Sequence, residues 1–325
     1  MTSPASLPSR WLAYARLLRI PNIFTAFADI AMGYFFVEPS LEPLYAFLAL
    51  VAASGCIYSA GMVLNDVFDV EVDRRERPRR PLPSEQIDVR WARRLGFGLL
   101  GMGVAAAWLA GLVFANEAAA LPWRSGAIAT ILAVCVLLYD AVLKKTPLGP
   151  LAMGSCRFFN VLMGMGLATR LPESPTAFLS YDAAQLLVAA GIATYIVGVT
   201  WFARSEATES RRPHLILAVI VMALGFVLLF YFPQYGEHKL RLRKNADFMW
   251  PVMLLFLAAS IFRRMLSAVT SPKPELVQAA IKHAILSLIV LDAAVTLVVR
   301  GQYEALGVVA LVAPMFFLGR WVYST

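Results

Sequence analysis

Long apolar stretches separated by short polar segments run along the whole 325-residue chain. A helix of roughly 20 apolar residues is long enough to cross a bilayer, and the pattern contains ten stretches close to that length. These stretches cover residues 22–37, 43–64, 95–115, 123–142, 148–168, 183–203, 214–232, 248–266, 277–298 and 306–321. The first and last are short, and residues 277–298 contain Lys282, His283 and Asp292. The pattern therefore predicts nine spans and leaves a tenth open.

The composition favours the same class of protein. Only 15% of the residues are charged and 59% are hydrophobic, with a mean hydropathy of +0.67. Soluble domains carry about 25% charged residues, and a water-soluble enzyme of this size needs more polar surface to cover its core. The composition thus excludes a water-soluble enzyme, a disordered chain and a fibrous chain, and it predicts an all-α polytopic membrane protein.

No linker rich in Ser or Gly divides the chain, so we expect one membrane domain over residues 1–325. Within residues 1–20 the apolar positions are interrupted by Arg10, Arg16 and Arg19. This pattern is typical of an amphipathic segment that lies on the membrane surface, and it differs from a cleaved signal peptide.

The cations indicate an orientation. The net charge is +8, and membrane proteins concentrate Lys and Arg in their cytoplasmic loops, so we expect anionic lipid rather than nucleic acid as the partner of this charge. Residues 65–94 contain eight arginines, and the cationic loops at 144–145, 204–212 and 263–273 alternate onto the same side. We therefore expect residues 65–94 in the cytoplasm, with the protein in a bacterial inner (plasma) membrane.

One loop disagrees with this orientation. Lys239, Arg241, Arg243 and Lys244 fall on the predicted outside. Either this loop is an exception, or the chain re-enters the membrane there, or the helix count is wrong.

An acidic cluster stands where the second span leaves the membrane, with the sequence Asn65-Asp66-Val67-Phe68-Asp69-Val70-Glu71-Val72-Asp73. In a continued helix, Asp66, Asp69 and Asp73 share one face. Their like charges repel unless a cation lies between them, and Mg²⁺ takes one or two carboxylates together with waters and substrate phosphates. Asn65 adds a neutral oxygen. These four residues are the candidate Mg²⁺ ligands, and the three carboxylates are the candidate catalytic residues.

Arginines follow this cluster directly, in the sequence Arg74-Arg75-Glu76-Arg77-Pro78-Arg79-Arg80-Pro81-Leu82-Pro83-Ser84. Carboxylates for a metal beside guanidinium groups for phosphate suit a metal-bound diphosphate. The alternative is a solvated acidic helix end in which Asp69 and Asp73 pair with these arginines.

A second polar group follows the fourth span, with Tyr139 and Asp140 at its end and Lys144 and Lys145 just beyond. Lysines at a helix end are commonly interfacial anchors. Arg157 and Asn160 differ, because they lie about one turn apart inside an apolar span, where a charge usually faces a polar cavity or a partner. Arg157 is therefore a candidate contact for a diphosphate or an acceptor.

These motifs carry a resemblance to a known family. Asn65-Asp66-x-x-Asp69-x-x-x-Asp73 followed by Arg77-Pro78-x-Arg80-Pro81-Leu82-Pro83-Ser84 resembles the first signature of the UbiA superfamily of intramembrane prenyltransferases. Tyr139-x-x-x-Leu143-Lys144-Lys145 is similar to a later conserved segment. The resemblance implies about nine spans around a central cavity and Mg²⁺-dependent transfer of a prenyl group. The donor would be an isoprenoid diphosphate and the acceptor a lipophilic or aromatic molecule.

The resemblance also implies the substrate contacts. Arg19-Ile20-Pro21-Asn22 resembles the entry segment of the family, so Asn22 faces the expected cavity. The candidate substrate contacts are Asn22, Asn65, Arg77, Arg80, Tyr139, Lys144, Lys145, Arg157, Asn160, Arg204 and Glu206.

The chain departs from the family after the sixth span, where members usually carry a second Asp-rich motif. In an internal alignment Glu206 takes the place of Asp69, but Ala203 and Ser210 replace the other two acids. We expect one metal ion at the first motif, with Arg204 or Arg211 supplying charge in place of a second ion. A simple charged cytoplasmic loop is the alternative.

Three functions compete. A non-catalytic transporter or lipid-binding protein fits the eroded second motif, but transporter sites usually lie near the bilayer midplane, whereas this acidic cluster lies at the membrane boundary. A magnesium-dependent phosphotransferase for lipid-linked alcohols also needs acids and arginines at the surface, but it does not call for the pattern of residues 65–84. The prenyltransferase is the main prediction.

Asp292, with Lys282 and His283, is a further functional candidate in a late span. A purely structural role, in helix packing or internal pairing, is the alternative.

Overall fold

The computed structural model describes residues 10–115, 117–204, 212–235 and 246–322. Within these ranges the chain consists of helices and their connections, without strands, which confirms the all-α prediction. The helices are α1 (Arg10–Leu17), α2 (Ile20–Val37), α3 (Leu44–Phe68), α4 (Val70–Glu76), α5 (Val89–Leu109), α6 (Arg124–Ala141), α7 (Gly149–Gly164), α8 (Ala183–Ala203), α9 (Arg212–Tyr231), α11 (Ala246–Thr270), α12 (Pro274–Val299), α13 (Gln302–Val309) and α14 (Val312–Val322). A π-helical turn (Ala110–Phe114) extends α5, and the 3-10 turns are Leu143–Lys145, Met165–Leu167 and Phe232–Gln234.

Nine helical segments in the described part of the chain are long and apolar enough to cross a membrane. They include Pro274–Val299, despite its ionisable residues, and Gln302–Val322, which comprises α13 and α14. Helix α7 has only 16 residues, but it starts beside Arg204 and the turn after it ends beside Ser125 at the other end of the bundle. Helix α7 therefore runs between the two ends of the bundle, and it occupies the predicted stretch at residues 148–168.

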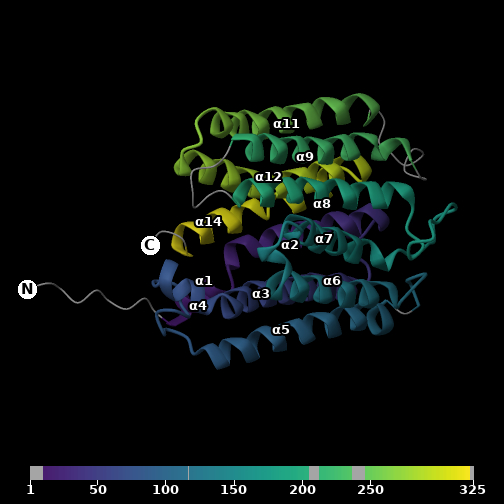
Figure 1. Ribbon diagram of the computed structural model, residues 1–325. Coiled ribbons are helices and arrows are strands. Elements are labelled where there is room, and N and C mark those ends of the chain that lie inside the picture. Colours follow the sequence, from purple (N-terminus) through teal and green to yellow (C-terminus); the bar gives the residue numbers. More distant parts are fainter. Residues whose placement is uncertain (1–9, 116, 205–211, 236–245, 323–325) are drawn as a thin grey trace, which may run out of the picture.

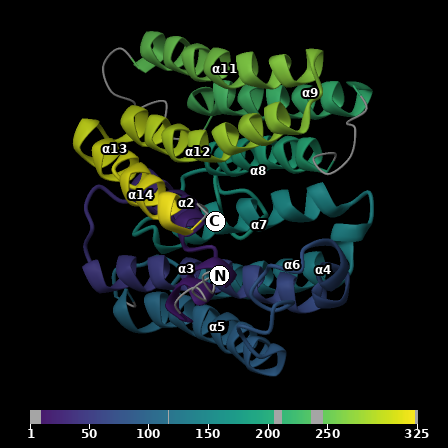
Figure 2. The ribbon, with the colours of Figure 1, turned by 90° about the vertical axis from the view of Figure 1, so that its left-hand side faces the viewer.

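The helices lie side by side in layers. From one side to the other these are α9 with α11, α8 with α12, α2 with α7, α3 with α6, and finally α5 (Figures 1 and 2). Helices α1, α4 and α14 gather at the end where both chain termini lie (Figure 1). We call this the motif end, because residues 65–84 lie there.

The predicted cationic loops meet at the motif end. Lys144 pairs with Asp69, Arg204 donates a hydrogen bond to the carbonyl oxygen of Lys144, and Arg212 donates to the carbonyl oxygen of Thr270 at 3.1 Å. The described parts of these loops therefore lie at the same end of the bundle, as the sequence predicted. The dissenting loop with Lys239, Arg241, Arg243 and Lys244 lies outside the described residues.

The predicted amphipathic N-terminal segment is helical from Arg10 to Leu17 and is docked on the bundle. Ala13 and Leu17 are buried in a small apolar cluster with Val67 of α3. Arg16 Nε donates to the carbonyl oxygen of Val322 at 3.1 Å and so joins this helix to α14. Helix α1 therefore packs against α3 and α14 at the motif end of the bundle.

Large apolar side chains are exposed on the outer helices. On α11, Leu255 and Phe256 are 70% and 72% exposed. On α9, Ile220 and Leu224 are also exposed. Soluble proteins rarely expose apolar surface on this scale. These faces suit a lipid environment and, together with the nine apolar helices, support a multi-pass membrane protein.

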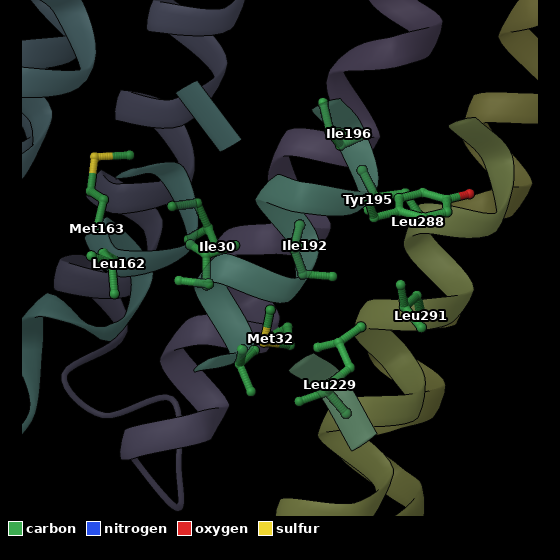
Figure 3. Close-up of a cluster of buried hydrophobic side chains, with 14 of the residues drawn as sticks. Ile30, Met32, Leu162, Met163, Ile192, Tyr195, Ile196, Leu229, Leu288 and Leu291 are labelled. Atoms are coloured by element: carbon green, nitrogen blue, oxygen red, sulfur yellow. The ribbon is translucent and has the colours of Figure 1, made fainter. Parts of the chain in front are cut away.

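The main buried apolar cluster extends from α2 to α12, and Figure 3 shows the part of it where five of these helices meet. Buried apolar side chains from α2, α7, α8, α9 and α12 contact one another there. Those labelled in Figure 3 are Ile30, Met32, Leu162, Met163, Ile192, Tyr195, Ile196, Leu229, Leu288 and Leu291. The hydroxyl of Tyr195 donates to the carbonyl oxygen of Ala284 at 2.8 Å, so this phenol is buried without losing its hydrogen bond.

Helices α2 and α7 approach each other closely through glycines. A Cβ atom at Gly33 would lie 2.6 Å from the carbonyl oxygen of Val161, and one at Gly164 would lie 2.7 Å from that of Ile30. Small residues allow such backbone contact between membrane helices. Since Asp29 precedes Gly33 by one helical turn, this contact also brings Asp29 to α7.

Gly33→Ala is expected to lower the free energy of unfolding by about 1–3 kcal/mol, because the added methyl group forces α2 away from the backbone of α7. Gly101→Ala is the matched control, since a Cβ there meets nothing within 4 Å. Alanine is the better helix former by about 1 kcal/mol, so the control should be at least as stable as the wild type. Thermal unfolding in detergent micelles measures both, and equal stability of the two variants would contradict the prediction.

Candidate active site

The acidic cluster lies at a break between two helices. Helix α3 ends at Phe68 and α4 starts at Val70, and Asp69 between them has φ −96° and ψ 2°. Backbone hydrogen bonds still run from Asp69 to Asn65 (3.0 Å) and from Asp73 to Asp69 (2.8 Å). The continuous helix that the sequence predicted is therefore interrupted at Asp69, while the chain keeps helical spacing across the break.

Two of the three carboxylates converge on one arginine. Arg80 Nη1 lies 2.7 Å from Asp73 Oδ2 and 3.3 Å from Asp66 Oδ1, and Arg19 Nη2 lies 3.5 Å from the same oxygen of Asp66. Asp69 pairs instead with Lys144, with 2.8 Å between Oδ2 and Nζ. The predicted shared face thus brings together Asp66 and Asp73, while Asp69 contacts a different cation.

The donor atoms of this cluster fit a magnesium ion. Asp66 and Asp73 are 5% and 3% exposed, and their two oxygens already flank a single cationic atom of Arg80. Mg²⁺ prefers oxygen ligands and usually takes one or two carboxylates plus waters and phosphate oxygens. Within the described ranges there is no group of three or more His, Cys, Asp and Glu side chains arranged to hold a metal. A magnesium ion here would therefore also need oxygens from its substrate.

Asp66 also lines a strongly basic hollow at the motif end. Residues 76–81, α1, α12 and α14 form its walls, and its charged side chains are six cations and two acids. They are Arg16, Arg19, Arg77, Arg79, Arg80, Lys282, Asp66 and Glu76. Asn22 lies in the same wall, so the structure brings together the predicted contacts Asn22, Arg77 and Arg80. We call this site the basic hollow; its guanidinium groups suit phosphate oxygens.

An apolar cavity lies on the other side of the end of α3, between α2, α3, α6 and α7. Its apolar lining includes Ile57, Met62, Leu132, Val136 and Met153, and its polar lining is Ser54, Tyr58, Tyr139, Asp140, Arg157 and Asn160. Asn65 and Asp66 are consecutive, yet Asn65 contacts Asp140 in the cavity wall while Asp66 lines the basic hollow. The end of α3 therefore connects the apolar cavity with the basic hollow.

Arg157 and Asn160 are held by a carboxylate on α2. Arg157 Nη1 donates to Asp29 Oδ2 at 2.8 Å and its Nη2 donates to Thr25 Oγ1 at 2.7 Å. Asn160 Nδ2 lies 2.9 Å from the same oxygen of Asp29, and its Oδ1 accepts a hydrogen bond from Ser54 Oγ at 2.7 Å. The partner that an intramembrane arginine requires is thus Asp29, and Arg157 meets the cavity as part of a buried ion pair.

The three ionisable residues of the predicted span 277–298 lie in different surroundings. Asp292 is fully buried in α12 and interacts with Asp29, so it belongs to the network around Arg157. Lys282 lines the basic hollow, and His283 lies 3.2 Å from Ser260 Oγ on α11. Asp292 and Lys282 therefore contribute to two separate polar sites.

Arg204 supports the turn that carries Lys144. Its Nη2 donates to the carbonyl oxygen of Lys144 at 3.0 Å and also to that of Thr146. These bonds point Arg204 at the backbone of the Leu143–Lys145 turn, where Lys145 is exposed. Glu206 and Arg211, the remaining residues considered for the second motif, lie outside the described residues.

Three residues of the site are not predicted from the sequence: Arg19, Asp29 and Asp140. Asp29 and Asp140 are acids in or at the end of apolar spans, and that position alone marks an acid as a candidate. Arg19 stands next to the entry segment that contains Asn22. The signals were present, but the pairing partners of these residues lie far away in sequence.

Two curated relatives match part of this chain. A digeranylgeranylglyceryl phosphate synthase from Methanoculleus marisnigri is 34% identical over 182 residues, which are 54% of this chain and 61% of the relative. The enzyme of that name from Saccharolobus solfataricus is 32% identical over 157 residues, or 48% of this chain and 51% of the relative. The chain thus matches only about half to three fifths of the length of these two curated relatives.

Solved structures share the fold. A structure of a digeranylgeranylglyceryl phosphate synthase in membranes superposes with a TM-score of 0.61 at 19% identity, covering 93% of this chain and 99% of that chain. A UbiA homolog from Aeropyrum pernix K1 gives a TM-score of 0.61 at 14% identity, covering 85% and 97%. Residues 26–325 match the UbiA prenyltransferase family, which spans nearly the whole chain. The chain belongs to the UbiA prenyltransferase family.

Proposed function

We propose that this protein is an integral-membrane prenyltransferase that moves a prenyl group from an isoprenoid diphosphate to an acceptor, with the help of Mg²⁺. One observation carries the proposal: the buried carboxylates of Asp66 and Asp73 share one cationic atom of Arg80, and Asp66 lines a hollow with six cationic side chains among the described residues. Such a site suits a metal-bound diphosphate, and an apolar cavity lies directly beyond the end of α3.

In this proposal the diphosphate of the donor binds in the basic hollow. Asp66 and Asp73 would hold Mg²⁺, with Asp69 and Asn65 beside them, and the ion would neutralise charge on the leaving diphosphate. Arg80 pairs with both carboxylates, and with Mg²⁺ held there its guanidinium group would be available for the phosphate oxygens. Arg77 and Arg19 line the same hollow. Lys144 fixes Asp69.

The prenyl chain and the acceptor would share the apolar cavity. Tyr58 and Tyr139 line it, and aromatic faces stabilise a developing allylic cation. The names of the curated relatives indicate a first acceptor to test, geranylgeranylglyceryl phosphate. We further propose that residues 1–325 act as one unit in a bacterial inner membrane. The motif end faces the cytoplasm, because the described cationic loops at 144–145 and 263–273 and most of residues 65–94 lie there.

The test uses purified protein in lipid nanodiscs with radiolabelled geranylgeranyl or farnesyl diphosphate. With geranylgeranylglyceryl phosphate and Mg²⁺ we expect release of diphosphate and a labelled lipid product. EDTA should abolish both, and added Mg²⁺ should restore them. Phenolic quinone precursors, tetrapyrroles and sugars are the further acceptors. Binding of the donor without turnover of any acceptor would favour a lipid-binding protein, and transfer of a phosphate group would favour a phosphotransferase.

A further inference from the structure

Asp140 carries a buried carboxylate oxygen that the site described above does not use. The residue is 2% exposed in the last turn of α6. Its Oδ1 accepts a hydrogen bond from Asn65 Nδ2 at 2.9 Å, whereas its Oδ2 is buried and has no hydrogen-bond partner within the described part of the chain. Buried polar atoms are normally satisfied, and an unsatisfied carboxylate oxygen is costly. This atom therefore points to a missing partner.

This oxygen belongs to a residue in the wall of the apolar cavity. Asp140 lines that cavity, and opposite it α3 presents Gly61, where an added Cβ would lie 3.9 Å from Asp140 Oδ2 and 3.1 Å from a methyl group of Val136. The glycine thus leaves the space in front of the oxygen without a side chain. Among the described residues, Arg157 is the one cation in the cavity lining, and it is already paired with Asp29.

Building on the proposed function, we propose that Asp140 Oδ2 accepts a hydrogen bond from the reacting hydroxyl group of the acceptor. The cavity would then select a molecule with an apolar body and a neutral hydrogen-bond donor. The apolar lining disfavours a charged group at this position. The acceptor class is therefore a lipophilic alcohol or phenol that meets Asp140 through its O–H.

The contacts of Asn65 place this hydroxyl near the donor. The side chain of Asn65 donates a hydrogen bond to Asp140. The backbone carbonyl oxygen of Asn65 accepts a hydrogen bond from Lys144 Nζ at 3.4 Å. The same ammonium group pairs with Asp69. A hydroxyl bound at Asp140 would therefore lie on the cavity side of the residues proposed to hold the metal and the diphosphate.

Binding of two matched pairs of probes tests the inference. The pairs are geranylgeranylglyceryl phosphate with its analogue lacking the free hydroxyl, and 4-hexylphenol with hexylbenzene, each titrated calorimetrically into the protein in nanodiscs. Because hydrogen bonds to charged groups are among the strong ones, the wild type should prefer the hydroxylated member of at least one pair by about 10-fold or more. Asp140→Leu should remove this preference. Asp140→Asn, which keeps the shape but loses the charge, should reduce it.

Donor binding separates this test from that of the proposed function. Geranylgeranyl diphosphate with Mg²⁺ should bind the wild type, and cooperative thermal unfolding of Asp140→Leu and Asp140→Asn shows that each variant is folded. Failure of the wild type to bind the donor would contradict the proposed function alone. No hydroxyl preference in either pair of the wild type, or an unchanged preference in the folded variants, would overturn the role of Asp140.

Discussion

Asp66→Asn is expected to lower kcat/KM for the isoprenoid diphosphate by about 10²–10³-fold, the range found when one group that stabilises developing charge is removed. Asp66 is almost completely buried, and its Oδ1 faces both Arg80 and Arg19. A neutral amide of the same shape removes the negative charge that would attract Mg²⁺ while leaving the arginines in place. The release of radiolabelled diphosphate measures the loss, and the Mg²⁺ concentration for half-maximal rate should rise.

The neighbouring acids provide the comparison. Asp73→Asn should resemble Asp66→Asn, because Asp73 shares Arg80 with it. Asp69→Asn should also abolish most turnover, since it leaves Lys144 without its carboxylate. Glu71→Gln is the matched control, because Glu71 is exposed on α4 and pairs only with Arg74 among its described contacts. Its activity should stay near that of the wild type, and unchanged turnover in both Asp66→Asn and Asp69→Asn would rule out the metal role.

The membrane spans could be predicted from the sequence because crossing a bilayer imposes a minimum apolar length. Even Pro274–Val299, which contains Lys282, His283 and Asp292, is long and apolar enough to form a span, since each of these three residues has a polar site or a partner to face. Helix boundaries were less certain. The break at Asp69 could not be anticipated, because helical spacing of the acids continues through it.

The acidic cluster and its arginines could also be predicted, because like charges at helical spacing require cations nearby. Which cation serves which acid depends on the tertiary fold. Arg80 reaches Asp66 and Asp73 only because residues 77–88 turn back over the end of α3, with Leu82 buried beneath them. Arg204 was expected at the substrate, but the fold directs it to the backbone beside Lys144. Its sequence position beyond an apolar span fits either role.

The pairing of Asp29 with Arg157 is the clearest case of information that the sequence lacks. Each residue alone is a charge in an apolar span and so predicts a partner. The two are 128 positions apart, and only the close packing of α2 on α7 at Gly33 and Gly164 brings them together. Its consequence for stability can be measured.

Arg157→Met is expected to lower the free energy of unfolding by about 3–5 kcal/mol, the usual loss when one member of a buried ion pair is removed. Methionine fills much of the space, but it leaves Asp29 and Asp292 buried next to each other without a cation. Thr25 also loses the hydrogen bond that Arg157 donates to its hydroxyl oxygen. Unfolding in detergent micelles, followed by circular dichroism, measures the change.

Arg90→Met is the matched control, because Arg90 is exposed on α5 and surface substitutions usually change stability by about 0.5 kcal/mol or less. The double variant Arg157→Met with Asp29→Asn should be more stable than Arg157→Met alone, since neutralising Asp29 removes the buried charge that has lost its cation. Additive losses in the double variant would contradict direct coupling between the two residues.

Because Arg157 also lines the apolar cavity, donor binding should weaken in the single variant and partly return in the double variant if the ion pair shapes that cavity.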